Sequence, residues 1–141
     1  MKTGLRLLLP MFFLLLLCTC KKDEQYIPEA AVNLTIYVND PTNLPISTIG
    51  GWKYFSGGYK GIVVYRKGQS EFVAYERCCP VRPEESASIV SVDTTNTVFL
   101  IDNSCSSKFL LNDGSTVSGP AIIPLRQYHT LYDGTTLRVT N

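Results

Sequence analysis

The chain has 141 residues, of which 45% are hydrophobic and 18% are charged, and its formal net charge at pH 7 is +1. This length and composition predict one domain with a buried core. Lys2 and Arg6 lie in a segment that we expect to be removed, which leaves eleven basic and twelve acidic side chains. A balance so close to zero gives no electrostatic basis for binding nucleic acid or for a polybasic membrane patch.

Residues 1–20 have the pattern of a lipoprotein signal peptide. Lys2 and Arg6 make a positive start, and the apolar run Leu7–Leu17 is too short to span a bilayer permanently. The run ends in Leu17-Cys18-Thr19-Cys20, which resembles the bacterial lipobox, with a Leu three residues before the acylated cysteine. The resemblance predicts that Cys20 is lipid-modified and anchors the protein, since acyl chains contribute about 0.8 kcal/mol per buried CH₂. A plain secretory peptide is the alternative.

Residues 21–31 are polar, interrupted by Pro28 and without periodicity, which predicts a tether between the anchor and a domain over residues 32–141. The Lys22-Asp23-Glu24 sequence resembles the export signal of Bacteroidota lipoproteins. That resemblance implies a lipid anchor in the outer membrane and exposure at the cell surface. An ordinary solvated linker is the alternative, because charge clusters are common in tethers.

From residue 32 the sequence alternates between short strand patterns and turn signals. Leu34, Ile36 and Val38 alternate with polar or amphipathic residues, as in a half-buried strand. The expected strands are 33–38, 62–65, 72–75, 89–92, 98–101, 128–132 and 136–140, with turn signals at 57–58, 67–68, 93–96, 113–114 and 133–134. No window has a helical period. The pattern predicts an all-β fold, an antiparallel β-sandwich or small barrel.

Three cysteines, Cys78, Cys79 and Cys105, remain after the lipidated terminus, in a compartment that we expect to be oxidising. Adjacent cysteines rarely bond to each other, so the pattern favours a disulfide between Cys105 and either Cys78 or Cys79. Such a bond closes a loop of about 26 residues and contributes about 3 kcal/mol in the chain-entropy model.

The second half of the domain resembles a Rieske-type ferredoxin domain. An aromatic residue, a glycine, Gly-Pro-Ala, Pro-Leu and a tyrosine follow one another over Phe109–Tyr128, in that family's order and spacing. The resemblance implies a Rieske-like antiparallel β-sandwich capped by two loops, with Gly119, Pro120 and Ala121 as a cover loop.

The positions that correspond to cluster ligands depart from the family. A Rieske [2Fe–2S] cluster needs two cysteines and two histidines. In the resemblance Cys79 takes the first cysteine position, Val81 the first histidine, Asp102 the second cysteine and Cys105 the second histidine. We therefore expect a ligand-deficient variant with no cofactor and no metal, and a Cys79–Cys105 disulfide joining the loops, with Cys78 as the alternative partner. A zinc site from the cysteines and Asp102 is a lesser alternative.

These features predict a non-catalytic interaction or structural module of the cell envelope, bound to the membrane through its lipid and to an envelope protein or ligand not identified by the sequence. The alternative is an envelope electron-transfer or thiol-redox protein with an atypical [2Fe–2S] or disulfide site. The single histidine, His129, lies in a strand pattern and predicts no catalytic role. The tyrosines and Trp52 are expected to pack the sheets rather than to line a glycan or ligand surface.

Overall fold

The computed structural model describes residues 24–141. The predicted signal peptide, the predicted lipidation site Cys20 and the start of the predicted tether lie outside the described residues. Over residues 24–141, no helix combines the length and the apolar character that crossing a membrane requires.

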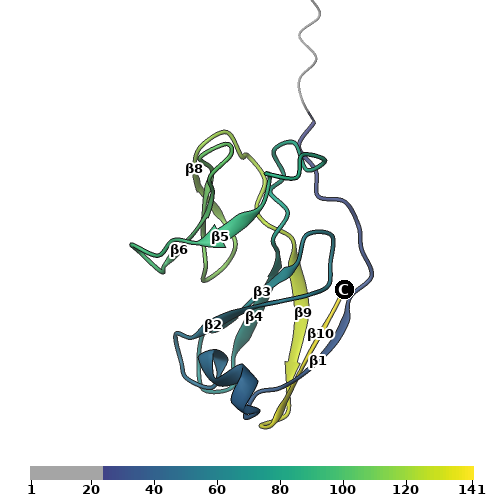
Figure 1. Ribbon diagram of the computed structural model, residues 1–141, viewed down its shortest axis with the longest axis vertical. Helices are drawn as coiled ribbons and strands as arrows, with labels where there is room; N and C mark the ends of the chain where they lie inside the picture. Colours follow the sequence, from purple (N-terminus) through teal and green to yellow (C-terminus); the bar gives the residue numbers. More distant parts are fainter. Residues whose placement is uncertain (1–23) are drawn as a thin grey trace, which may run out of the picture.

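Two antiparallel sheets make up the domain (Figure 1). The larger has six strands in the order β1-β10-β9-β4-β3-β2, and the smaller has the order β5-β6-β7-β8. The strands are β1 (Asn33–Tyr37), β2 (Trp52–Phe55), β3 (Ile62–Arg66), β4 (Phe72–Glu76), β5 (Val90–Val92), β6 (Phe99–Asp102), β7 (Lys108–Leu110), β8 (Thr116–Ser118), β9 (Gln127–Tyr132) and β10 (Thr136–Thr140), with a 3₁₀ helix, η2 (Pro41–Ile46), after β1. The prediction of an all-β antiparallel fold is confirmed.

Seven strands match the expected segments to within two residues at either end, whereas β2, β7, β8 and η2 were not predicted. All four residues of β2 are half-buried, because side chains on both of its faces pack against buried residues, Trp52 and Tyr54 on one face and Phe55 on the other. Its sequence therefore lacks the alternation of buried and exposed residues from which strands are predicted. Helix η2 begins where Asp40 accepts a hydrogen bond from the Thr42 backbone N–H at 2.8 Å and Pro41 supplies a helical φ angle.

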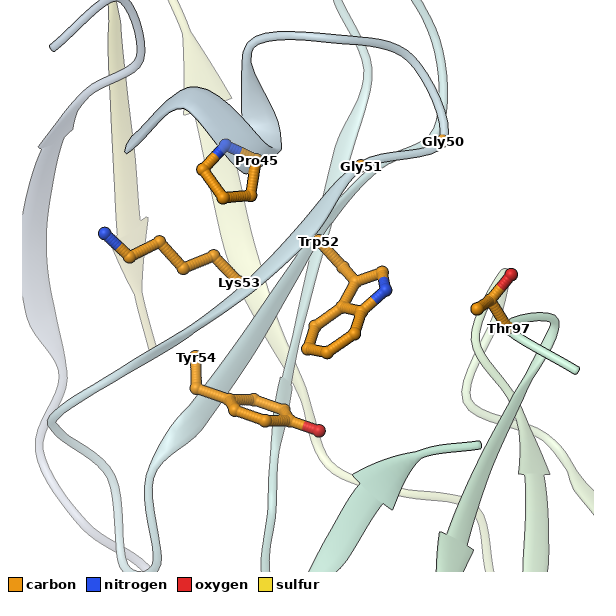
Figure 2. Close-up of a pocket in the computed structure, with 7 residues that line it drawn as sticks. All are labelled: Pro45, Gly50, Gly51, Trp52, Lys53, Tyr54 and Thr97. Atoms are coloured by element: carbon orange, nitrogen blue, oxygen red, sulfur yellow. The ribbon is translucent and has the colours of Figure 1, made fainter. Parts of the chain in front are cut away.

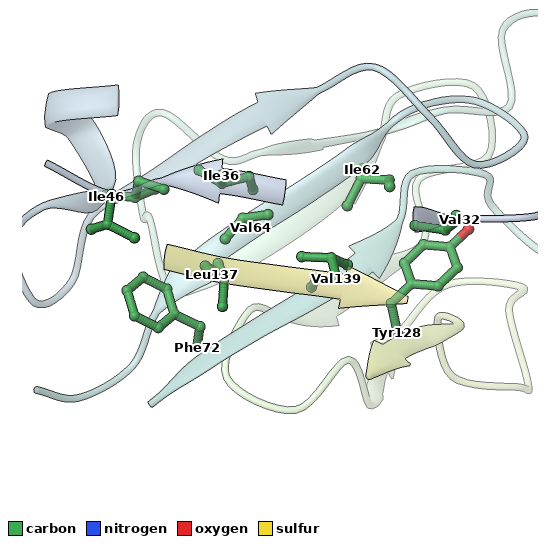
Figure 3. Close-up of a cluster of buried hydrophobic side chains, with 11 residues drawn as sticks. Val32, Ile36, Ile46, Ile62, Val64, Phe72, Tyr128, Leu137 and Val139 are labelled. Carbon is green, nitrogen blue, oxygen red and sulfur yellow. The ribbon is translucent and has the colours of Figure 1, made fainter. Parts of the chain in front are cut away.

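The central strands β3 and β4 are buried on both faces and separate two cores. Ile62 and Val64 face the first core, while the intervening Val63 faces the second. The first core lies within the curl of the larger sheet (Figure 3) and consists of Val32, Ile36, Val38, Ile46, Ile62, Val64, Phe72, Ala74, Tyr128, Leu137 and Val139. The second lies between the two sheets and consists of Val63, Val73, Tyr75, Cys79, Val90, Val92, Leu100, Phe109, Leu111, Ala121 and Leu125. This two-sided burial explains the continuous apolar run of β3.

The edge strand β2 is tied to the smaller sheet through Tyr54 and Arg77. The Tyr54 hydroxyl accepts a hydrogen bond from the Val92 backbone N–H at 2.7 Å. The Arg77 guanidinium lies 3.7 Å from the centre of the Tyr54 ring. It also donates to the Val90 carbonyl at 3.0 Å and to the Ser91 hydroxyl at 3.2 Å. These contacts fix the smaller sheet, and the loops it holds, against β2 and β4.

Residues 25–31, predicted as part of the tether, have no regular secondary structure and are bound along the domain. The Gln25 side chain donates to the Pro120 carbonyl and accepts from the Ile122 N–H, both at 2.7 Å. Arg126 donates to the carbonyls of Ile27 and Pro28 at 2.5 and 3.0 Å. The chain therefore enters the domain beside the predicted cover loop.

Candidate functional site

Three potential ligands from two loops meet at one end of the smaller sheet. Cys79 lies in the loop after β4, while Asp102 ends β6 and Cys105 follows it in the turn before β7. The ligand atoms of these residues all lie within 4.8 Å of one another. The two sulfurs are 3.8 Å apart, and Cys105 Sγ is 3.4 Å from Asp102 Oδ2. Cys79 and Asp102 are fully buried, whereas Cys105 is partly exposed.

The buried carboxylate of Glu76 positions the start of the Cys79 loop. It accepts hydrogen bonds from the backbone N–H groups of Tyr59 and Lys60 at 2.6 and 2.9 Å. It also accepts from the Cys78 N–H at 3.0 Å and the Tyr128 hydroxyl at 2.7 Å. Four donors on one carboxylate compensate for its desolvation and join the 57–60 turn, β9 and the cysteine loop.

Ser88 stabilises the loop that contains Cys79 through hydrogen bonds to two of its residues. Its hydroxyl donates to the Val81 carbonyl and lies 3.4 Å from Asp102 Oδ2. The Cys79 N–H donates to the Ser88 carbonyl at 3.3 Å. Ser88 therefore links the first loop to the carboxylate that begins the second.

The turn from Asp102 to Ser107 orients the other two ligands. Asp102 Oδ1 accepts from the backbone N–H and the hydroxyl of Ser104, both at 2.7 Å. The Ser106 N–H donates to the Asp102 carbonyl at 2.8 Å, and the Asp102 N–H donates to the Ser107 carbonyl at 2.9 Å. One carboxylate oxygen thus holds the turn, and the other faces the sulfur of Cys105.

Each loop contains one non-glycine residue with a positive φ angle. Arg82, with φ 52°, follows Val81, and Ser106, with φ 61°, follows Cys105. Such conformations are uncommon for these residue types and persist where the surroundings impose them. Both loops are therefore held in defined shapes on either side of the sulfur pair.

The predicted cover loop packs directly on the second cysteine loop. Gly119 has φ 93°, and a Cβ atom there would lie 2.6 Å from Ser107 Cα and 2.8 Å from the Ser106 carbonyl oxygen. The Ala121 N–H donates to the Ser107 hydroxyl at 3.1 Å, and that hydroxyl is 3.0 Å from Cys105 Sγ. Position 119 of the Gly-Pro-Ala sequence needs glycine, because only glycine allows this close approach.

Burial favours the neutral form of both adjacent cysteines. It raises the pKa of the Cys78 thiol to about 11. Burial, aided by the nearby Asp102 carboxylate, also raises the pKa of Cys79. Burial opposes ionisation of Asp102 as well, but hydrogen bonds from Ser104 and the two cysteines outweigh it, so that the pKa of Asp102 lies below its usual value. At neutral pH the site holds protonated Cys79 beside an ionised carboxylate.

The structure separates the two possible partners of Cys105. Cys79 lies against Cys105, whereas the Cys78 sulfur faces the carbonyls of Cys79 and Pro83 at 3.5 and 3.8 Å. All three cysteines of the described residues are free thiols. The sulfurs of Cys79 and Cys105 are 3.8 Å apart, which exceeds the roughly 2.05 Å of a disulfide bond. The two sulfurs are in contact but not bonded, so the Cys79–Cys105 disulfide stays a prediction.

The donor set does not fit a Rieske [2Fe–2S] cluster, which binds one iron with two thiolates and the other with two imidazoles. Val81, which the resemblance placed at the first histidine position, is apolar and packs against the second core. Among the described residues, the potential ligand group contains no histidine. The lone His129 is exposed on β9, paired with Thr140 of β10.

A second candidate is an open aromatic hollow of about 640 Å³ between η2, β2 and the β5–β6 hairpin (Figure 2). The Trp52 and Tyr54 rings form one wall, with centroids 5.1 Å apart. Its lining is Pro45, Gly50, Gly51, Trp52, Lys53, Tyr54 and Thr97. The Tyr54 hydroxyl is already bonded to β5, which matches the prediction that this aromatic residue serves packing. Trp52 is only partly covered.

The polar residues that shape the thiol site, Glu76, Ser88 and Ser107, were not among the predicted site residues. A usable signal existed for the turn, because Asp102-Asn103-Ser104 has the Asp-x-Ser/Thr pattern of an Asx turn. No comparable signal marks Ser88, whose partners Val81 and Asp102 lie on both loops.

No protein-family model matches this chain, and no curated protein matches it. Among solved structures, one that is similar is the ferredoxin of carbazole 1,9a-dioxygenase from Nocardioides aromaticivorans IC177. The superposition has a TM-score of 0.46 with 20% sequence identity and covers 66% of this chain and 86% of the ferredoxin. The chemistry of the site therefore follows from this chain's own side chains.

Proposed function

We propose that this chain is a lipid-anchored cell-envelope protein whose Rieske-like domain has lost its iron–sulfur ligands and works as a non-catalytic interaction or structural module. Cys20 is its lipidation site, and the outer membrane, facing the cell surface, is its location. The lipobox-like sequence and the Lys22-Asp23-Glu24 sequence support these two assignments. The binding partner is an envelope protein or ligand.

The observation that carries the proposal is the contact between Cys79 and Cys105 at 3.8 Å, at two positions where the resemblance expects cluster ligands. In an oxidising compartment the two thiols form one S–S bond and release two protons and two electrons to a disulfide-containing oxidant. The bond joins the loops that a cluster would otherwise join. The sulfurs need to approach by only about 1.8 Å to reach bonding distance.

The protonation of the thiols supports a structural rather than a thiol-redox role. Thiol exchange proceeds through the thiolate, and reactive cysteines have a pKa below the usual value. Here burial raises the pKa of Cys78 to about 11 and also raises that of Cys79. Neither buried cysteine has the character of an exchanging nucleophile.

The test uses the full chain, purified from membranes in detergent without reductant. It measures lipid modification, the mass of the domain, the number of free thiols, and the content of iron and acid-labile sulfide. We expect acylation at Cys20, a folded domain two mass units lighter than its fully reduced form, and one alkylatable thiol, Cys78, after denaturation. Cys20→Ala should leave the protein unlipidated. Iron and acid-labile sulfide near two per chain would contradict the proposal, as would two or more alkylatable thiols in the domain before reduction.

Surface exposure has its own test. Protease added to intact cells should degrade the anchored domain, and replacement of Lys22, Asp23 and Glu24 by alanine should protect it. A domain that is degraded only after the outer membrane is opened would instead be periplasmic.

A further inference from the structure

We infer that, in the reduced protein, Cys79, Asp102 and Cys105 bind one zinc ion in a mononuclear tetrahedral site. The inference rests on the proposed function in one respect, that no iron–sulfur cluster occupies these residues. Binding releases the two thiol protons to solvent and forms two Zn–S bonds and one Zn–O bond. Two soft thiolates with one hard carboxylate suit the borderline-soft Zn²⁺ better than the hard cations Mg²⁺ or Ca²⁺.

Two of the three distances between the ligand atoms match the edges of one tetrahedron, and the third pair, Cys79 Sγ and an Asp102 oxygen, lies within 4.8 Å. With Zn–S bonds of about 2.3 Å and a Zn–O bond of about 2.0 Å, two sulfurs lie about 3.8 Å apart, and a sulfur and an oxygen lie about 3.5 Å apart. The structure has 3.8 Å between Cys79 Sγ and Cys105 Sγ, and 3.4 Å between Cys105 Sγ and Asp102 Oδ2. One metal ion at these bond lengths satisfies the two separations that Cys105 makes with its neighbours.

The carboxylate is the observation that a disulfide leaves unexplained. Two buried thiols in ordinary contact would also be about 3.8 Å apart, but they have no need of a third group. Five Asp-x-Ser/Thr turns in the described residues, at Asp40, Asp93, Asp102, Asp113 and Asp133, use Oδ1 to accept from the backbone N–H two residues later. Of these five aspartates only Asp102 is buried. Its second oxygen is aimed at a sulfur.

The neighbouring hydroxyl groups orient the ligands as supporting groups do in metal sites. Ser88 Oγ lies 3.4 Å from Asp102 Oδ2, and Ser107 Oγ lies 3.0 Å from Cys105 Sγ. Ser107 in turn accepts from the N–H of Ala121 in the cover loop. Hydrogen bonds of this kind fix ligand orientation and tune affinity. The partly exposed Cys105 leaves the fourth position open to water or to one further ligand.

The experiment titrates metal into the full chain in detergent, after reduction with a phosphine and removal of metals by chelation. Against a chromophoric chelator we expect one Zn²⁺ per chain with a submicromolar Kd. Co²⁺ in place of Zn²⁺ should give the thiolate-to-metal charge-transfer band and the visible bands of a tetrahedral site with two sulfur ligands. Absence of stoichiometric binding, or an octahedral Co²⁺ spectrum, would overturn the inference.

Three variants test the ligands and one serves as the control. Cys79→Ser and Cys105→Ser should abolish stoichiometric binding, and Asp102→Asn should weaken it at least tenfold. Cys78→Ser should bind as the parent does, since the Cys78 sulfur faces backbone carbonyls instead. The amino-terminal Cys20 is the same in every variant. If Cys79→Ser does not fold, as judged by circular dichroism, the more exposed Cys105→Ser decides.

The outcomes separate this inference from the proposed function. Iron and sulfide in the purified protein would contradict both. A disulfide that forms as proposed, in a protein that binds no zinc after reduction, would contradict the zinc site alone. Equal zinc binding by the parent and Cys105→Ser would do the same.

Discussion

Two buried tyrosines of neighbouring strands differ in how their hydroxyl groups are satisfied. The Tyr128 hydroxyl donates to the Glu76 carboxylate at 2.7 Å, whereas the buried Tyr75 hydroxyl has no hydrogen-bond partner among the described residues. A buried polar group without a partner costs about 1–3 kcal/mol, and a hydrogen bond to a charged group contributes about 1.5–3 kcal/mol. The same chemical deletion should therefore have opposite effects at the two positions.

Tyr75→Phe should raise the free energy of unfolding by about 1 kcal/mol, because it removes an unsatisfied hydroxyl and keeps the ring in the second core. Tyr128→Phe should lower it by about 2 kcal/mol, because it leaves the buried Glu76 with one donor fewer. Urea unfolding at pH 7, under one redox condition, measures both. A loss of stability in Tyr75→Phe would show that the hydroxyl contributes through a contact absent from this structure.

The same tyrosines predict a loss of stability at alkaline pH. Burial, aided by Asp113, raises the pKa of Tyr75, and burial together with the Glu76 hydrogen bond raises that of Tyr128. A phenol in the unfolded chain ionises near pH 10. Above that pH the unfolded state binds fewer protons than the folded state, so the stability present below pH 10 falls by up to about 1.4 kcal/mol per pH unit for each group.

Unfolding measured from pH 8 to pH 11 checks this prediction. Each Tyr→Phe variant should lose stability less steeply above pH 10 than the parent does, and the double variant should be the least steep. Parallel curves for the parent and the double variant would exclude the tyrosines as the cause. Lysines titrate in the same range but are common to all variants.

The short turns show which part of the architecture is predictable from local sequence. The Asp133-Gly134 turn joins β9 and β10, and Asp133 Oδ1 accepts from the N–H groups of Thr135 and Thr136. All the contacts that fix this hairpin lie within four residues, and its strands have regular alternation. Sequence analysis located it for that reason.

The strands and site residues that were missed depend on distant contacts. Strand β7 has only three residues, and its apolar Phe109 is buried between half-buried neighbours. Glu76 stands at a polar position that periodicity cannot distinguish from a solvated one, yet two of its donors are 16 and 17 residues earlier in the chain. The cysteine count predicted that Cys105 meets Cys78 or Cys79, and only the Rieske resemblance selected Cys79.

The close packing of the cover loop on the second cysteine loop predicts the effect of a substitution at Gly119. Gly119→Ala should destabilise the domain, because φ is 93° and the new Cβ would collide with the backbone of Ser106 and Ser107. Gly134→Ala is the matched control, since φ there is 102° but a Cβ atom added to it would have no neighbouring atom within 4 Å. The control should cost about 1–2 kcal/mol for the backbone conformation alone.

Gly119→Ala should cost about 1–3 kcal/mol more than the control, the cost of overpacking. It should also change the reactivity of Cys105, because Ser107 links that sulfur to Ala121. Thermal unfolding and the rate of alkylation of the reduced protein measure the two effects. Equal destabilisation by the two substitutions would mean that the cover loop moves away without cost.

At the scale of the whole molecule, the domain consists of two sheets that share the second core and are tied at a few polar contacts. The larger sheet encloses the first core together with η2, and its strands β1, β9 and β10 contribute no residue to the core between the sheets. Arg77, half-buried just after β4, bonds β5 and covers the Tyr54 ring. We therefore expect the smaller sheet to open while the larger sheet stays folded.

Arg77→Lys tests this division, because lysine keeps the charge but cannot make the two directed bonds together with the stacking on Tyr54. We expect a loss of about 2–3 kcal/mol. In hydrogen exchange, the amides of β5 and β6 should exchange faster than in the parent, while those of β9 and β10 stay unchanged. The exposed Arg138→Lys on β10 should alter stability by no more than about 0.5 kcal/mol. Equal acceleration in both sheets would instead mean that the domain opens as a single unit, with the thiol site protected by the stability of the whole fold.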